Sequence, residues 1–117
     1  MQASQRNRIE QALAAAEGEF RERLIAALRR CAGGAWGLFG QNDNVDLPPG
    51  FAERAYEDSG AKTLMALGRE IEEMRNRLGM VEPFPLLARF RELRGYKTAN
   101  DLGEARLAQD WLTELGQ

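Results

Sequence analysis

Histidine is absent from this chain of 117 residues. Its absence removes the side chain that most often serves as a general base near neutral pH. It also excludes Ser-His and Cys-His nucleophile pairs, histidine-ligated zinc and the Glu-x-x-His motif of di-iron bundles. An enzyme built on this chain would have to use carboxylates, lysine, tyrosine, arginine or a borrowed cofactor. The sequence therefore predicts no catalytic residues and favours a non-enzymatic protein.

Cysteine is nearly absent too, because the chain contains only Cys31. A disulfide within the chain is excluded, and a reducing compartment is predicted. Cys31 lies on an apolar helical stripe, which favours a buried structural thiol over a reactive one. Residues 1–8 are polar and basic, without the apolar stretch of a secretory signal. No apolar run approaches the ~20 residues of a membrane span. We predict a cytoplasmic protein that does not enter a membrane.

The β-branched residues, which favour β-strands, are scarce: the whole chain has two valines, three isoleucines and three threonines. No segment alternates apolar and polar residues as a half-buried strand does. The hydrophobic fraction is 44% and the charged fraction is 29%, as in ordinary globular proteins. We therefore predict one all-α domain over residues 1–117, folded as a single helical bundle of about four main helices.

The first predicted helix is long. It runs from Ser4, as N-cap, to about Cys31, and apolar residues recur along it every three or four positions. Two pairs at i,i+4, Glu17–Arg21 and Glu19–Arg23, are expected to support its exposed face. Gly18 lies opposite the apolar stripe, where it marks a bend or is simply tolerated.

Three shorter helices follow, predicted over about residues 59–78, 85–94 and 102–115. Glycines 79, 95 and 116 are placed to end them, Pro85 suits a first helical turn, and Asp101 with Glu104 resembles a capping box. The third helix is expected to bury Leu86, Phe90 and Leu93. The predicted core of the bundle consists of Leu13, Phe20, Leu24, Leu28, Leu64, Leu67, Ile71, Met74, Leu78, Phe90, Leu93, Trp111 and Leu112.

The loop from residue 33 to residue 47 is the predicted partner or ligand surface. Long irregular connections are uncommon in compact domains and often carry function. This one combines large apolar side chains with neighbouring polar groups that can orient a ligand. In an alternative interpretation, its aromatic residues plug the open end of the bundle. The residues proposed for the surface are Trp36, Leu38, Phe39, Gln41, Asn42 and Asp43.

A homodimer through the first helix is also predicted. About 28 helical residues extend roughly 42 Å, whereas a compact domain of this size is only about 35 Å across. Part of the helix should therefore overhang the bundle and expose Ile9 and Leu13 unless a second copy covers them. In the alternative, a bend at Gly18 folds the first half of the helix back onto the core.

Other ligand classes have little support. The net charge of −2 and the alternation of arginine with glutamate along the first helix argue against nucleic acid. Residues 43–46 lack the spacing of a calcium loop, and the glycine-rich residues 33–40 match neither a Walker loop nor a dinucleotide fingerprint. Glu70, Glu72 and Glu73 are expected to form a solvated helix face. The sequence therefore predicts no metal and no cofactor.

These exclusions lead to a functional hypothesis. The chain is expected to be a small cytoplasmic module for protein–protein interaction or regulation, with a protein partner that the sequence does not identify. The alternative is a small-ligand-binding protein, or a carboxylate-dependent enzyme, that uses the 33–47 loop as a pocket wall.

Overall fold

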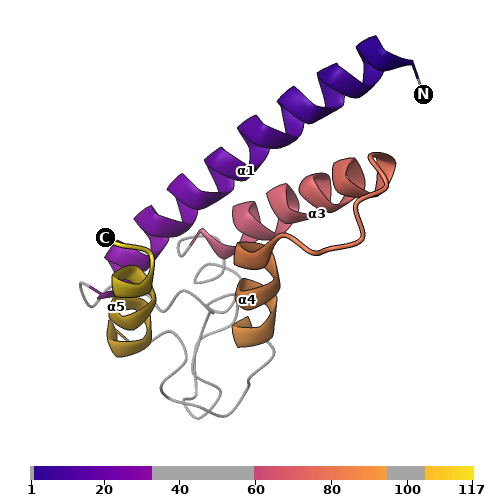
Figure 1. Ribbon diagram of the computed structural model, residues 1–117. Helices are drawn as coiled ribbons and strands as arrows, with labels where there is room; N and C mark the ends of the chain where they lie inside the picture. Colours follow the sequence, from indigo (N-terminus) through magenta and orange to yellow (C-terminus); the bar gives the residue numbers. More distant parts are fainter. Residues whose placement is uncertain (1, 33–59, 95–104) are drawn as a thin grey trace.

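The computed structural model describes residues 2–32, 60–94 and 105–117. These ranges contain four helices and no strand, which confirms the predicted all-α fold (Figure 1). The predicted surface in the 33–47 loop lies outside the described residues, as do the capping pair at 101 and 104 and the side chains of Cys31 and Leu93. The helices are α1 (Ala3–Ala32), α3 (Ala61–Arg77), α4 (Pro85–Arg94) and α5 (Ala105–Glu114).

Helix α1 is the long element of the fold, with 30 residues and a length of about 45 Å. It begins at Ala3, so Ser4 lies inside the first turn and the prediction of Ser4 as N-cap is wrong. The helix continues without interruption through Gly18, which no neighbouring group approaches within 4 Å of an added Cβ. Of the two predicted pairs, Arg23 does bond Glu19, at 3.0 Å, whereas Glu17 pairs with Arg75 of α3.

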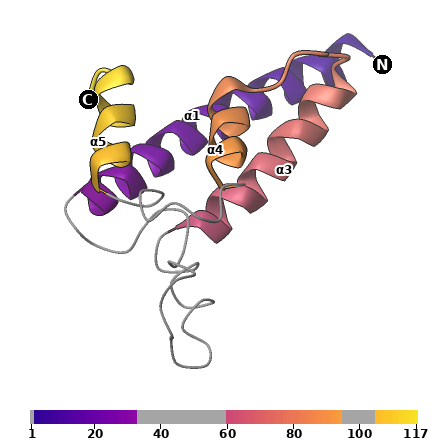
Figure 2. The ribbon, with the colours of Figure 1, turned by 90° about the horizontal axis from the view of Figure 1, so that it is seen from below.

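Helices α3 and α5 pack against α1 (Figures 1 and 2). Helix α3 runs antiparallel to it. Gly60, at the start of α3, lies beside Ala27, and Leu78, at its end, lines the same hollow as Leu13. The end of α5 is bonded to α1, because the guanidinium of Arg21 donates to the Leu115 carbonyl at 3.2 Å. Helices α3 and α5 thus both pack against α1, and of the described helices α3 alone reaches its first half, at Leu13.

Helix α4 contacts both α3 and α5 through its side chains. Arg91 of α4 bonds Glu72 of α3, and Arg89 of α4 pairs with Glu114 of α5 and lies 5.0 Å from the centre of the Trp111 ring. At the centre of the bundle, Phe20 of α1 meets Phe84 and Phe90 edge-on, with ring centroids 5.6 and 6.3 Å apart. In the described ranges, no helix combines the length and apolar composition needed to cross a bilayer.

The buried core agrees with the predicted one at most positions. Eleven of the thirteen predicted residues are buried, Met74 is only partly buried, and Leu93 lies outside the described side chains. The structure adds four buried residues that were not in the predicted core: Ile9, Ala27, Leu87 and Ala108.

The inward face of α4 was predicted wrongly at one position. Leu87 is 2% exposed, whereas Leu86 is only partly buried. The reason lies across the interface on α3, where Gly68 has no side chain. A Cβ at Gly68 would overlap the end of the Leu87 side chain. The glycine therefore lets α4 approach closely and gives Leu87 its place in the core.

The predicted exposure of Ile9 and Leu13 is also wrong. Within a single chain, Ile9 is 9% exposed and Leu13 is 6% exposed. The two side chains are covered because α3 lies along α1 and brings Leu78 to the first half of the longer helix, as a spherical domain would not. The homodimer itself stays a prediction, without these two side chains as its exposed surface.

Candidate functional site

The candidate site is built around the connection between α3 and α4, residues 78–84. Helix α3 ends in a Schellman motif at Gly79, whose φ of 74° lies in the left-handed region that glycine adopts without strain. The amide of Gly79 bonds the Asn76 carbonyl at 3.0 Å, and the amide of Met80 bonds the Arg75 carbonyl at 2.9 Å. Pro85 then begins α4, as its fixed φ favours. The connection is therefore fixed at both ends.

Arg75 fixes the middle of the connection. Its guanidinium donates from Nε and Nη2 to the carbonyl oxygen of Glu82, at 3.2 and 3.0 Å. It also bonds the carboxylate of Glu17 on α1 and lies 5.9 Å from the centre of the Phe84 ring. Only 12% of the Arg75 side chain is exposed. The Arg75 side chain, which comes from α3, thus holds the α3–α4 connection against both α3 and α1.

On this fixed connection the structure displays two apolar side chains. Val81 is 95% exposed and Met80 is 40% exposed, and they are the large hydrophobic residues exposed in the described part of the chain. Scattered exposed apolar residues are ordinary on protein surfaces. The distinctive feature here is that hydrogen bonds hold the backbone on both sides of Val81, so its outward position is set by the fold.

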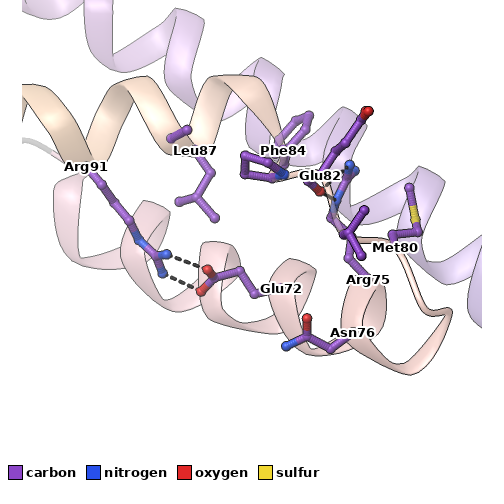
Figure 3. Close-up of a pocket in the computed structure, with 11 residues that line it drawn as sticks. Glu72, Arg75, Asn76, Met80, Glu82, Phe84, Leu87 and Arg91 are labelled. Atoms are coloured by element: carbon purple, nitrogen blue, oxygen red, sulfur yellow. Dashed lines mark hydrogen bonds and ion pairs between the residues drawn. The ribbon is translucent and has the colours of Figure 1, made fainter.

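Two hollows flank Met80. The α3–α4 hollow has a volume of about 250 Å³, and Figure 3 shows the Glu72–Arg91 pair bridging the two helices beside Leu87. The α1 hollow, of about 390 Å³, lies between the first half of α1 and the end of α3. The α3–α4 hollow is lined by Glu72, Arg75, Asn76, Met80, Val81, Glu82, Pro83, Phe84, Leu87, Ala88 and Arg91. The α1 hollow is lined by Arg6, Glu10, Leu13, Ala14, Glu17, Leu78 and Met80.

Glu72 and Arg91 close one side of the α3–α4 hollow with two parallel hydrogen bonds of 2.6 Å. The bonds from Arg91 lower the pKa of Glu72, against the smaller raising effect of burial. Glu72 was expected on a solvated helix face with Glu70 and Glu73. It is instead partly buried and bonded to the neighbouring helix.

This pair predicts a pH dependence of stability. A carboxylate with a lowered folded-state pKa stabilises the protein above its ordinary pKa of about 4.3, and this contribution is lost as pH falls through the lowered value. Because both side chains are at least one third exposed, the contribution at neutral pH is below about 1 kcal/mol. Glu72→Gln is expected to lose about 0.5–1 kcal/mol in urea unfolding at about pH 7, and a smaller amount at about pH 3, where the carboxylate begins to be protonated. Glu70→Gln serves as the exposed control, and an equal loss from Glu72→Gln at both pH values would contradict the assignment.

The sequence-predicted surface and the observed site involve different residues. The partner or ligand surface predicted around Trp36 lies outside the described residues and stays a prediction. Gly79 and Pro85 were predicted only as helix boundaries, and Val81 was not among the predicted functional residues. The available signal was a valine between a helix-ending glycine and two prolines. Among the described side chains, no group of three or more Cys, Asp or Glu residues is arranged as a metal site.

Comparisons with known proteins give no relative from which a function could be inferred. No protein-family model, curated protein or solved structure matches the chain. The geometry of the described residues is therefore the basis for proposing a function.

Proposed function

We propose that the protein is a non-enzymatic interaction module of the cytoplasm that binds a partner protein at the α3–α4 connection. One observation carries the proposal: Val81 is 95% exposed on a connection that hydrogen bonds hold on both sides. Binding costs less entropy when the contacting segment is already ordered in its bound conformation. A fixed apolar side chain is therefore a better anchor than the same residue on a loose loop.

The size of the α3–α4 hollow supports a protein partner over a small molecule. Pockets that enclose drug-sized ligands usually have volumes of about 300–1,000 Å³, whereas this hollow has about 250 Å³. A hollow of that size suits one apolar side chain of a partner. Met80, beside it, is flexible and polarizable, as residues at adaptable binding surfaces often are.

Val81→Ser tests the proposal. The side chain is exposed, so the free energy of unfolding should change by less than about 0.5 kcal/mol. Binding of a partner anchored by Val81 should weaken at least about tenfold, as loss of a binding hot spot does. The tagged chain is recovered from its own organism, and quantitative mass spectrometry measures any partner that co-purifies near one-to-one.

The matched control is Gln109→Ser, an exposed position on α5, which should leave recovery unchanged. Light scattering on the purified chain reveals self-association, which would identify the partner as a second copy. A stoichiometric partner recovered equally well by Val81→Ser would show that the module binds elsewhere, and the loop at 33–47 would then be the next surface to test.

A further inference from the structure

The charges around the two hollows do not cancel completely. Three arginines and four glutamates line them. Each arginine is paired with one glutamate: Arg6 bonds Glu10 at 3.0 Å, Arg91 bonds Glu72 at 2.6 Å, and Arg75 bonds Glu17. The carboxylate that remains is that of Glu82. In the described ranges it has no ion-pair partner, although the backbone carbonyl of the same residue accepts both bonds from Arg75.

The uncompensated charge lies directly beside the apolar anchor. Glu82 follows Val81 in the chain, and both residues line the α3–α4 hollow together with Phe84 and Leu87. The site therefore offers a recess with a mixed polar and apolar lining, in which the arginines are already paired, and one unpaired negative charge beside it. An acidic partner would be repelled by Glu82, and it would recruit Arg75 or Arg91 only by breaking a pair that already exists. A basic partner finds its counter-charge without disturbing either pair.

We propose that the natural occupant of the α3–α4 hollow is a basic segment of a partner protein. This segment places one apolar side chain in the hollow and a lysine or arginine beside Glu82. The inference rests on the proposed function and adds the chemistry of the partner to it. Because Glu82 is exposed, its contribution is modest and sensitive to salt, and it acts as a preference between partners.

Three blocked tripeptides test the proposal on the full chain: acetyl-Lys-Leu-Lys-amide, acetyl-Glu-Leu-Glu-amide and acetyl-Lys-Ala-Lys-amide. Methyl NMR of Val81 and Leu87 reports binding at the hollow. At low salt the Lys-Leu-Lys peptide is expected to bind about two- to fivefold more tightly than the Glu-Leu-Glu peptide, the range of one exposed ion pair. Glu82→Gln should remove that preference, and Glu70→Gln, which deletes an exposed glutamate outside the hollows, should retain it.

The outcomes distinguish failure of the preference for a basic segment from failure of the proposed binding at the α3–α4 connection. Equal binding of the two leucine peptides, both above the alanine peptide, would overturn the basic preference and leave docking of an apolar anchor intact. Equal binding of the two lysine peptides would overturn the inference, because charge alone would then explain the effect. The absence of saturable shifts with any peptide would overturn it too. Shifts that depend on protein concentration without peptide would assign the hollow to a second copy.

Discussion

Replacing Phe20 by alanine is expected to destabilise the protein by about 3–5 kcal/mol, the largest effect of any single substitution considered for this chain. The side chain is fully buried. Its ring meets Phe84, which precedes α4, and Phe90, within α4, at interplanar angles of 76° and 80°. The substitution removes the ring from the junction of α1 with α4 and adds the loss of two edge-on aromatic contacts to the cavity.

Urea unfolding followed by helical circular dichroism measures this effect. Domains of this kind have total stabilities of about 5–15 kcal/mol, so the Phe20→Ala variant should unfold at a much lower urea concentration. Gln11→Ala, on the exposed face of α1, is the control and should change stability by less than about 0.5 kcal/mol. A loss below about 1 kcal/mol for Phe20→Ala would mean that α1 does not pack against α4 as described.

Arg75→Met is expected to have the second largest effect, a loss of about 2–3 kcal/mol. Methionine retains much of the apolar stem but removes every hydrogen bond of the guanidinium. The change leaves the carboxylate of Glu17, whose side chain is 24% exposed, and the carbonyl of Glu82 without their donor. Hydrogen bonds to charged groups contribute about 1.5–3 kcal/mol, and partial exposure keeps the total near that value.

Arg23→Met is the matched control, because it also breaks an arginine–glutamate pair of α1. That pair is about half exposed on both sides, so its loss should be below about 0.5 kcal/mol. Arg75→Lys should recover little stability, since a single ammonium cannot reproduce the fork of donors. If the two methionine variants lose the same amount of stability by urea unfolding, Arg75 is a surface side chain and does not fix the connection.

The helices and several of their ends could be predicted from the sequence because their signals are local. A stripe with steps of three and four residues identifies a buried helical face without knowledge of what covers it. Gly79 and Gly116 end helices through hydrogen bonds within their own neighbourhoods, and both adopt positive φ. Pro85 begins α4 for a similarly local reason.

Apart from the N-cap of α1, the errors arise where two helices meet. The stripe on α4 placed Leu86 in the core because periodicity identifies a broad face, whereas the absent side chain of Gly68 on α3 gives that place to Leu87. Glu17 was paired with Arg21 on its own helix, but Arg75 reaches it from α3. In both cases the deciding group lies on another helix, at a distance along the chain that no helical repeat encodes.

The candidate site was missed for a related reason. Exposure of Val81 follows from the hydrogen bonds that Arg75 makes with the connection, and those bonds require α3 and the connection to be in place. In the sequence, Val81 is simply a valine near two prolines. In the sequence, Glu82 is equally one glutamate among many. Its carboxylate is distinctive only in the fold, where each arginine that lines the two hollows is bonded to a different glutamate.

The packing of α1 has a consequence for how the chain folds. Helical proteins usually fold fast because their contacts are local in sequence. Here Glu17 bonds a residue 58 positions away, and Arg21 bonds one 94 positions away. A nascent chain therefore carries the apolar face of α1, including Leu24 and Leu28, out of the ribosome long before α5 has been synthesised. During that interval this face is open to chaperones and to aggregation, and its coverage is complete only after α5 has been synthesised.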